Sequence, residues 1–260
     1  MLDVAFSFLD LEYFLLILVR VSCFVFIAPF FSLNNTPAQV RIALSVFTAI
    51  LLYGILTPTE AVVYDSVIDY AIIVCREAIT GLLIGFSASI CTMIVNFAGS
   101  MVDMETGLSM ATMYDPSTKM MNSVSGSFYQ YMLMMMLIAS GMYRYLLGAL
   151  VDSFALIPVN GAVLRGENLT ATMITFMSDY LLLGFRICLP VFCVTLMLNA
   201  VLGILAKVSP QMNMFAVGIQ LKLIVGFGVM FLTSGMLSGA ANMIFTEIKK
   251  ITVSFVEGML

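Results

Sequence analysis

Six long apolar segments constrain this chain more than any other feature of its sequence. They are residues 11–33, 40–57, 67–98, 128–150, 179–207 and 214–247. A helix that crosses a bilayer needs about 20 mostly apolar residues, so each segment is a candidate span. Only 10% of the residues are charged and 62% are hydrophobic, whereas a soluble domain is usually about 25% charged. The sequence therefore predicts an all-α, multi-helix protein of the integral-membrane type.

The segments differ in length, and so do the connections between them. Two segments exceed the spanning length, which predicts tilt, a break or extension beyond the bilayer, and Pro190 should bend the fifth. We expect long loops at residues 99–127 and 152–178. The tail, residues 248–260, has the pattern of a short amphipathic helix that lies on a membrane or a partner. Its apolar face would hold Ile248, Ile251, Phe255 and Met259.

Composition excludes several classes of function. The chain has no histidine, which removes His-based acid–base catalysis, Ser–His–Asp triads and His-ligated metal sites. We find no P-loop and no nucleophile-elbow motif. The formal net charge is -4, and no basic run suggests nucleic-acid binding. The five cysteines lie in apolar segments, where they pack as small hydrophobes. We expect no enzyme, no cofactor and no metal.

Charged residues inside the apolar segments conflict with a simple six-span topology. The basic residues outside them divide evenly between the two sides of such a topology, so the positive-inside rule gives no orientation. A charge at the centre of a spanning helix costs about 2.5–3.5 kcal/mol on insertion scales. These charges either line a transport path or pair across helices, out of contact with lipid, and we favour pairing. The acidic residue Glu77 also lies within an apolar segment, and the predicted buried cations are Arg20, Arg76, Arg144, Arg186 and Lys222.

Small residues recur at helical spacing in two places. Glu77, Gly81, Gly85 and Ser89 fall on one face of a helix, and Gly235 and Gly239 form a second pair. Such stripes let helix backbones approach closely. We interpret both as subunit-packing faces, with packing inside this one chain as the alternative.

Methionine is concentrated in one part of the chain. Half of the 22 methionines lie between Met101 and Met142, and several fall in the predicted loop 99–127. Because methionine is unbranched and adaptable, it suits a surface that must close on unlike partners. Asp103 and Glu105 would be costly in lipid, so we expect this loop to face water or a pore.

Three stretches resemble one known family. They run from Gly99 through Gly107 to Pro116, from Val208 through Pro210 to Gly218, and from Ala28 to Arg41. Together they resemble the FliR family of flagellar export-gate subunits, which is shared with the T component of virulence type III secretion. The second stretch holds the most specific motif, with Pro210, Gln211, Asn213, Phe215 and Gly218 at the positions of the family's turn.

The resemblance implies an architecture and a set of partners. Residues 1–178 would form a part like the P subunit of the gate, residues 179–247 a helical hairpin like the Q subunit, and residues 248–260 the tail. Tilted helices would join P and Q subunits in a helical hetero-oligomer in the bacterial inner membrane, at the flagellar basal body. Much of that assembly would lie above the membrane plane. Other partners would be the B-type switch protein, unfolded export substrates and membrane lipid.

The resemblance also implies a plug that occludes the closed gate. By position it would be Gly107, Leu108, Ser109, Met110, Ala111, Thr112, Met113, Tyr114, Asp115 and Pro116. The chain would then be a structural and gating subunit for unfolded flagellar proteins. The alternative is a secondary transporter or channel that uses the in-span charges Arg76, Glu77 and Arg186.

Overall fold

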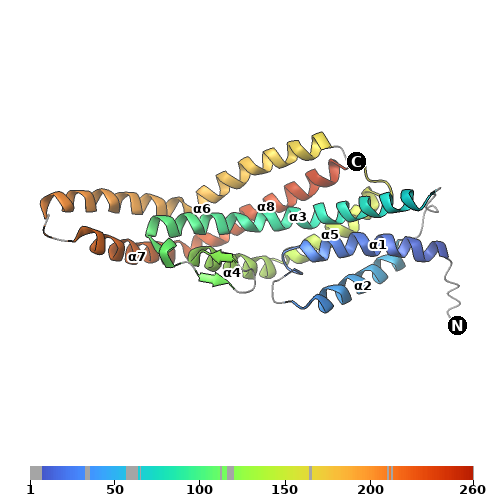
Figure 1. Ribbon diagram of the computed structural model, residues 1–260, viewed down its shortest axis with the longest axis horizontal. Coiled ribbons are helices and arrows are strands. Elements are labelled where there is room, and N and C mark those ends of the chain that lie inside the picture. Colours follow the sequence, from blue (N-terminus) through green and yellow to red (C-terminus); the bar gives the residue numbers. More distant parts are fainter. Residues whose placement is uncertain are drawn as a thin grey trace. The chain divides into compact units, whose positions relative to one another are not determined.

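A computed structural model describes residues 8–32, 36–56, 64, 66–111, 113–115, 120–163, 166–209, 211 and 213–259. Most of these residues are helical (Figure 1). The α-helices are α1 (Phe8–Ile27), α2 (Ala38–Ile55), α3 (Val67–Thr106), α4 (Val124–Ala139), α5 (Met142–Leu156), α6 (Gly166–Val208), α7 (Met214–Thr233) and α8 (Leu237–Glu257). The 3-10 turns are η1 (Leu108–Ala111) and η2 (Ser234–Met236), and the strands are β1 (Met113–Asp115) and β2 (Met120–Asn122).

Four helical stretches in the described residues are long and apolar enough to cross a membrane. They are α2, α3, α6 and the joined α7–α8 region, residues 216–257, and a fifth arises if α4 and α5 count as one broken span. The prediction of an all-α protein of the membrane type is therefore confirmed. Two three-residue strands are the exception, and both lie between α3 and α4.

Several predicted boundaries were wrong. The helix α3 continues to Thr106 and α6 already begins at Gly166, so both predicted long loops are shorter than expected. The fourth apolar segment is split between α4 and α5, where Gly141 has a φ of 72°. That left-handed conformation suits glycine and interrupts a right-handed helix. The sixth segment is split by η2.

The chain divides into two compact units. Unit 1 comprises residues 1–90, 141–175 and 248–260, and unit 2 comprises residues 91–140 and 176–247. In unit 1, α1 packs along α2 (Figure 1). Its core includes Leu16, Ile17 and Phe24 of α1, all fully buried. Each such side chain contributes about 1.5–3 kcal/mol by leaving water.

The predicted amphipathic tail is part of unit 1. It is the end of α8 rather than a separate helix. Its apolar face is buried inside the chain, with Ile248, Phe255 and Met259 fully covered. The hydroxyls of Ser87 and Thr252 lie 2.8 Å apart and bond to each other. The tail therefore closes the core of unit 1 and does not leave its apolar face for a membrane.

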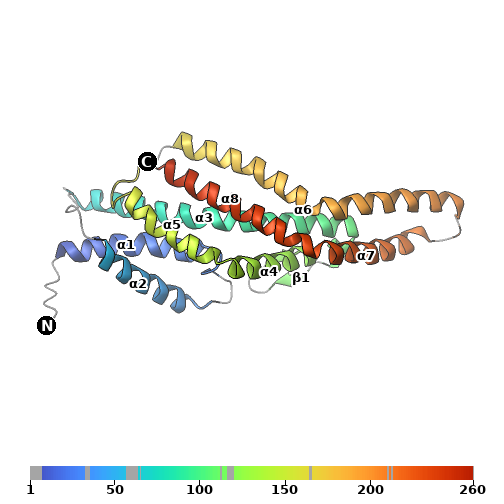
Figure 2. The same ribbon diagram turned by 180° about the vertical axis from the view of Figure 1, so that it is seen from behind.

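In unit 2, α6 and α7 lie side by side as an antiparallel pair, as Figures 1 and 2 both show. The chain reverses direction between the end of α6 at Val208 and the start of α7 at Met214. Pro190 lies inside α6, where its missing N–H and its ring disturb the helical hydrogen bonds, and the ribbon of α6 changes direction along its length (Figure 1). The core of this unit includes Ile94, Ala98, Leu137 and Ile244, all fully buried.

Candidate functional site

The predicted plug lies between α3 and α4 and has a structure of its own. Gly107 has a φ of 83° and ends α3 in the left-handed conformation, a common helix terminator. The 3-10 turn η1 follows, and β1 then pairs antiparallel with β2, with Tyr114 opposite Met121. Of the ten predicted plug residues, Thr112 and Pro116 lie outside the described residues. The segment is thus a short β-ribbon between two helices.

A buried carboxylate holds the base of this ribbon. Asp103 belongs to the last turns of α3 and is 1% exposed. Its two carboxylate oxygens accept hydrogen bonds from the Ser125 backbone N–H, at 3.2 and 3.3 Å. The Ser123 hydroxyl oxygen caps α4 by accepting from the Gly126 N–H at 2.9 Å. The N-terminus of α4 stabilises the buried charge of Asp103, a contribution of up to about 2 kcal/mol.

Close backbone contact fixes the same base. A Cβ atom on Gly99 of α3 would collide with the backbone of Gly126 in α4. A Cβ on Gly226 of α7 would collide with the side chain of Thr106, the last residue of α3. Four helices of unit 2 therefore meet at the root of the ribbon, since Thr195 of α6 also donates to Glu105 Oε2 at 3.4 Å.

In unit 1, the structure pairs two of the charges predicted inside apolar segments. Arg20 of α1 and Glu77 of α3 are both fully buried, and Arg20 Nε donates to Glu77 Oε2 at 2.6 Å. Arg20 Nη1 donates to the carbonyl oxygens of Ser153 and Ile157, at 3.3 and 3.0 Å. Its guanidinium lies 4.2 Å from the ring centroid of Phe154.

Glu77 completes the network. Its Oε1 accepts a hydrogen bond from the backbone N–H of Asn160 at 2.9 Å. The carbonyls of Ser153 and Ile157 lie at the C-terminal end of α5, where a helix lacks hydrogen-bond donors and favours a cation. The ion pair thus joins α1, α3, the end of α5 and the turn that follows.

The predicted packing stripe on α3 is used within the chain. A Cβ on Gly81 would collide with the carbonyl of Arg20, and one on Gly85 would lie 2.9 Å from the carbonyl oxygen of Phe24. Glu77 on the same face is already bound to Arg20, and Ser89 falls on it too. For Gly81 and Gly85 the subunit-packing interpretation is corrected, because α1 occupies this face. By contrast, a Cβ on Gly235 or Gly239 would meet nothing within 4 Å.

The other predicted buried cations are not covered by this chain alone. Arg76, Arg144 and Arg186 are exposed, and Lys222 is half-buried. The structure does not bring Arg76 to Glu77, since Glu77 binds Arg20. Burial of these four cations stays a prediction about an assembly.

The predicted turn motif lies between α6 and α7. Pro210 lies outside the described residues, and Gln211 is exposed. Asn213 caps α7, its side-chain oxygen accepting from the Ala216 N–H at 3.4 Å. Phe215 belongs to the first turn of α7, and a Cβ on Gly218 would touch Leu202 of α6 at 3.4 Å. Asn213 and Gly218 therefore shape the hairpin.

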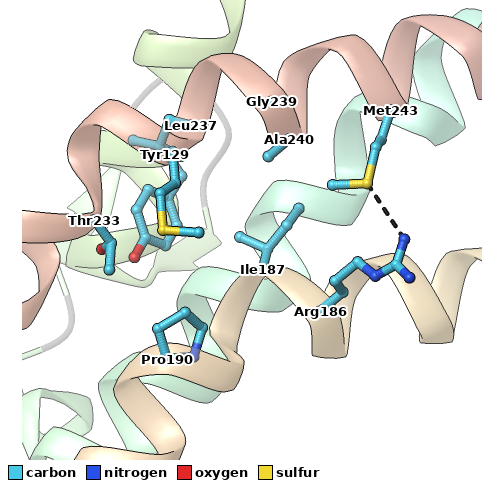
Figure 3. A pocket seen from close by; sticks show the side chains of 10 residues that line it. Tyr129, Arg186, Ile187, Pro190, Thr233, Leu237, Gly239, Ala240 and Met243 are labelled. Atoms are coloured by element: carbon cyan, nitrogen blue, oxygen red, sulfur yellow. Dashed lines mark hydrogen bonds between the residues drawn. The ribbon is translucent and has the colours of Figure 1, made fainter.

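A cleft in unit 2 was not predicted from the sequence. It has a volume of about 350 Å³ and lies between α6 and α8 (Figure 3). Tyr129, Arg186, Ile187, Pro190, Thr233, Met236, Leu237, Gly239, Ala240 and Met243 line it. The signal in the sequence was the pair of interruptions at Pro190 and at the Thr233–Gly235 stretch, where helices pack less regularly.

The described residues contain no cluster of three or more histidine, cysteine, aspartate or glutamate side chains that could hold a metal ion. In unit 1, the buried charges of Arg20 and Glu77 bind each other. The arrangement is that of a packed helical scaffold with a ribbon at one of its helix junctions.

Comparison with known proteins gives consistent matches across the chain. Residues 11–248 match the description "Bacterial export proteins, family 1". The chain is 29% identical over 216 residues to the flagellar biosynthetic protein FliR of Bacillus subtilis (strain 168), covering 82% of this chain and 83% of that protein.

Relatives from other bacteria give similar matches. Identity to the flagellar biosynthetic protein FliR of Escherichia coli (strain K12) is 25% over 231 residues, covering 89% of this chain and 87% of that protein. Identity to the protein of that name from Aquifex aeolicus (strain VF5) is 27% over 244 residues, covering 92% and 91%. The family match over residues 11–248 includes the ribbon between α3 and α4 and parts of both units.

Proposed function

Since this chain belongs to bacterial export proteins, family 1, we propose that it is a structural and gating subunit of the flagellar type III export gate. The match over residues 11–248 is the observation that carries the proposal. Together with the apolar helices, this match supports a component of the flagellar export apparatus in the inner membrane.

The chain joins P and Q subunits of the gate, with residues 1–178 as the P-like part and residues 179–247 as the Q-like hairpin. The antiparallel pairing of α6 and α7 supports the hairpin. The open surroundings of Gly235 leave room for a neighbouring helix. The assembly lies at the basal body, much of it above the membrane plane.

Residues 107–116, which include η1 and the first strand of the β-ribbon, act as the plug. A plug must stay in place when the gate is closed and move without unfolding its support. The described geometry supports both requirements, because Asp103 and the Gly99–Gly126 contact fix the root while the ribbon has only two short strands. Methionines of the ribbon adapt to a passing unfolded chain without sequence preference. The B-type switch protein is a separate subunit that contacts the gate.

The test is removal of the plug in assembled gates. Replacing residues 107–116 by a short Gly-Ser linker should make the inner membrane leaky to small ions and solutes. The matched control is the same variant in cells that lack the P subunit, where no gate forms and no leak is expected. Normal assembly without any change in permeability would overturn the plug assignment.

The transport alternative has less support. Glu77 is bound by Arg20 and by the Asn160 N–H, so its carboxylate has no free oxygen for a transported ion. A transporter should purify as a monomer or small homo-oligomer. A gate subunit should purify with unlike membrane subunits, which intact-complex mass spectrometry distinguishes.

A further inference from the structure

Arg186 lies at the end of a charge-free stretch of α6. Residues 187–206 hold no charged side chain, and Lys207 follows them. About 20 helical residues rise about 30 Å, the thickness of the hydrocarbon core of a bilayer. The chain that follows the turn has a similar stretch, because residues 223–246 also hold no charged side chain. In a bilayer crossed by this hairpin, Arg186 would lie at the level of the phospholipid headgroups.

Arg186 lies at one edge of the cleft in unit 2. Ile187 and Pro190 form its α6 wall, and Leu237 and Ala240 belong to the α8 wall (Figure 3). Gly239 contributes no side chain, and a Cβ there would meet nothing within 4 Å. The volume of about 350 Å³ falls within the range of about 300–1,000 Å³ that is usual for ligand pockets. The cleft is therefore a mostly apolar space with one cation at its edge.

The charge of Arg186 has no anionic partner among the described residues. Its hydrogen bond goes from Nη1 to the sulfur of Met243 at 3.5 Å, as Figure 3 shows. A thioether is a weak acceptor, whereas a guanidinium offers five N–H donors. Exposed apolar side chains flank it on α6, namely Leu182, Phe185 and Leu189. An anion that also carries an apolar tail would satisfy both features.

We propose that this cleft binds an anionic phospholipid. The Arg186 guanidinium donates two hydrogen bonds to phosphate oxygens in the bidentate arrangement that suits its planar fork. One acyl chain lies in the cleft against Ile187, Pro190 and Leu237. Basic pockets between membrane helices are typical sites for anionic lipid headgroups. This inference is independent of the plug, because it concerns α6 and α8 rather than the ribbon.

The experiment titrates the purified intact complex with phosphatidylglycerol and counts bound lipids by native mass spectrometry. Arg186→Gln should weaken phosphatidylglycerol binding about tenfold, the factor expected for losing a hydrogen-bonded charge. Arg186→Lys should retain part of the binding. Gly239→Leu, which fills the cleft, should weaken binding of both phosphatidylglycerol and phosphatidylcholine. The matched controls are Arg76→Gln, an exposed cation of unit 1, and Gly54→Leu, which meets open space and does not line the cleft. Both should bind lipid as the wild type does.

Three outcomes would overturn the proposal. The first is unchanged phosphatidylglycerol binding in Arg186→Gln. The second is displacement of phosphatidylglycerol by inorganic phosphate at similar concentration, which would indicate a simple anion site. The third is an intact complex without this lipid, in which a cysteine at position 239 cross-links to another subunit. If Gly239→Leu fails to assemble, Arg186→Gln and Arg186→Lys decide the question alone.

Discussion

Glu77→Gln tests the buried ion pair of unit 1 most directly. The change removes the negative charge and leaves the Arg20 guanidinium fully buried beside a neutral amide. Breaking a buried pair by removing one partner costs about 3–5 kcal/mol, because the other charge loses its compensation. The glutamine oxygen still accepts from the Asn160 N–H, so we expect the lower end, about 3 kcal/mol. That is a large fraction of the usual stability of about 5–15 kcal/mol.

The double variant Arg20→Met/Glu77→Leu should be less harmful than the single changes combined. It removes both charges and fills their space with apolar atoms, which is often close to neutral for a buried pair. The carbonyl of Ile157 and the Asn160 N–H then lose their partners, which costs about 1–3 kcal/mol per group if no other partner replaces them. The Ser153 carbonyl keeps its hydrogen bond from the Ile157 N–H, at 2.8 Å. A charge swap should not rescue, because a carboxylate at position 20 would face those two carbonyl oxygens.

The assay is unfolding of the purified chain or complex in detergent, followed by helical circular dichroism. The cycle compares the wild type, Arg20→Met, Glu77→Leu and the double variant, and Glu77→Gln is measured beside it. The coupling energy from this cycle should exceed about 1 kcal/mol, the range for residues in one network. Arg76→Gln, the exposed neighbour, should change stability by less than about 0.5 kcal/mol. Strictly additive effects of the two single changes would refute the reasoning. In cells, Glu77→Gln should reduce assembly more than it reduces export by gates that do assemble.

Two further predictions follow from the packing. Gly81→Leu should destabilise unit 1 by several kcal/mol, because its side chain would strike the Arg20 backbone. Gly54→Leu meets open space and should leave the amount of assembled complex unchanged. Equal loss of assembled complex in both variants would argue against the close α1–α3 contact. Asp103→Ala removes the acceptor of the Ser125 N–H, which costs about 1–3 kcal/mol. It should raise the basal leak of assembled gates in a solute-permeability assay, and an unchanged leak would separate the ribbon from its base.

The sequence predicted the helices better than the places where they stop. Apolar segments long enough to span a membrane identify α2, α3 and α6, because hydropathy is a local property. The end of α3 could not be placed, since residues 101–106 hold methionine and acidic side chains that suit either a loop or a helix. Tertiary contact decides: Val102 and Asp103 are buried, and helical structure satisfies the backbone there.

Pairing of charges was the least predictable part of the site. Arg20 and Glu77 stand out as charges in apolar segments, but their separation of 57 residues gives no local signal. The adjacent Arg76 and Glu77 point in different directions on a helix, and Arg76 is exposed as that spacing implies. The cleft beside Arg186 could not be foreseen either, since it depends on how α6 and α8 are interrupted and packed.

The Arg20 network also sets an order of events during synthesis. Arg20 leaves the ribosome 57 residues before Glu77 and 137 residues before Ile157. At about 5–20 residues per second, it lacks its carboxylate for about 3–11 s, and it lacks the Ile157 carbonyl for about 7–27 s. We therefore expect α1 to wait in contact with the insertion machinery until α3 arrives. The set of Arg20 partners is complete only when the end of α5 has been synthesised.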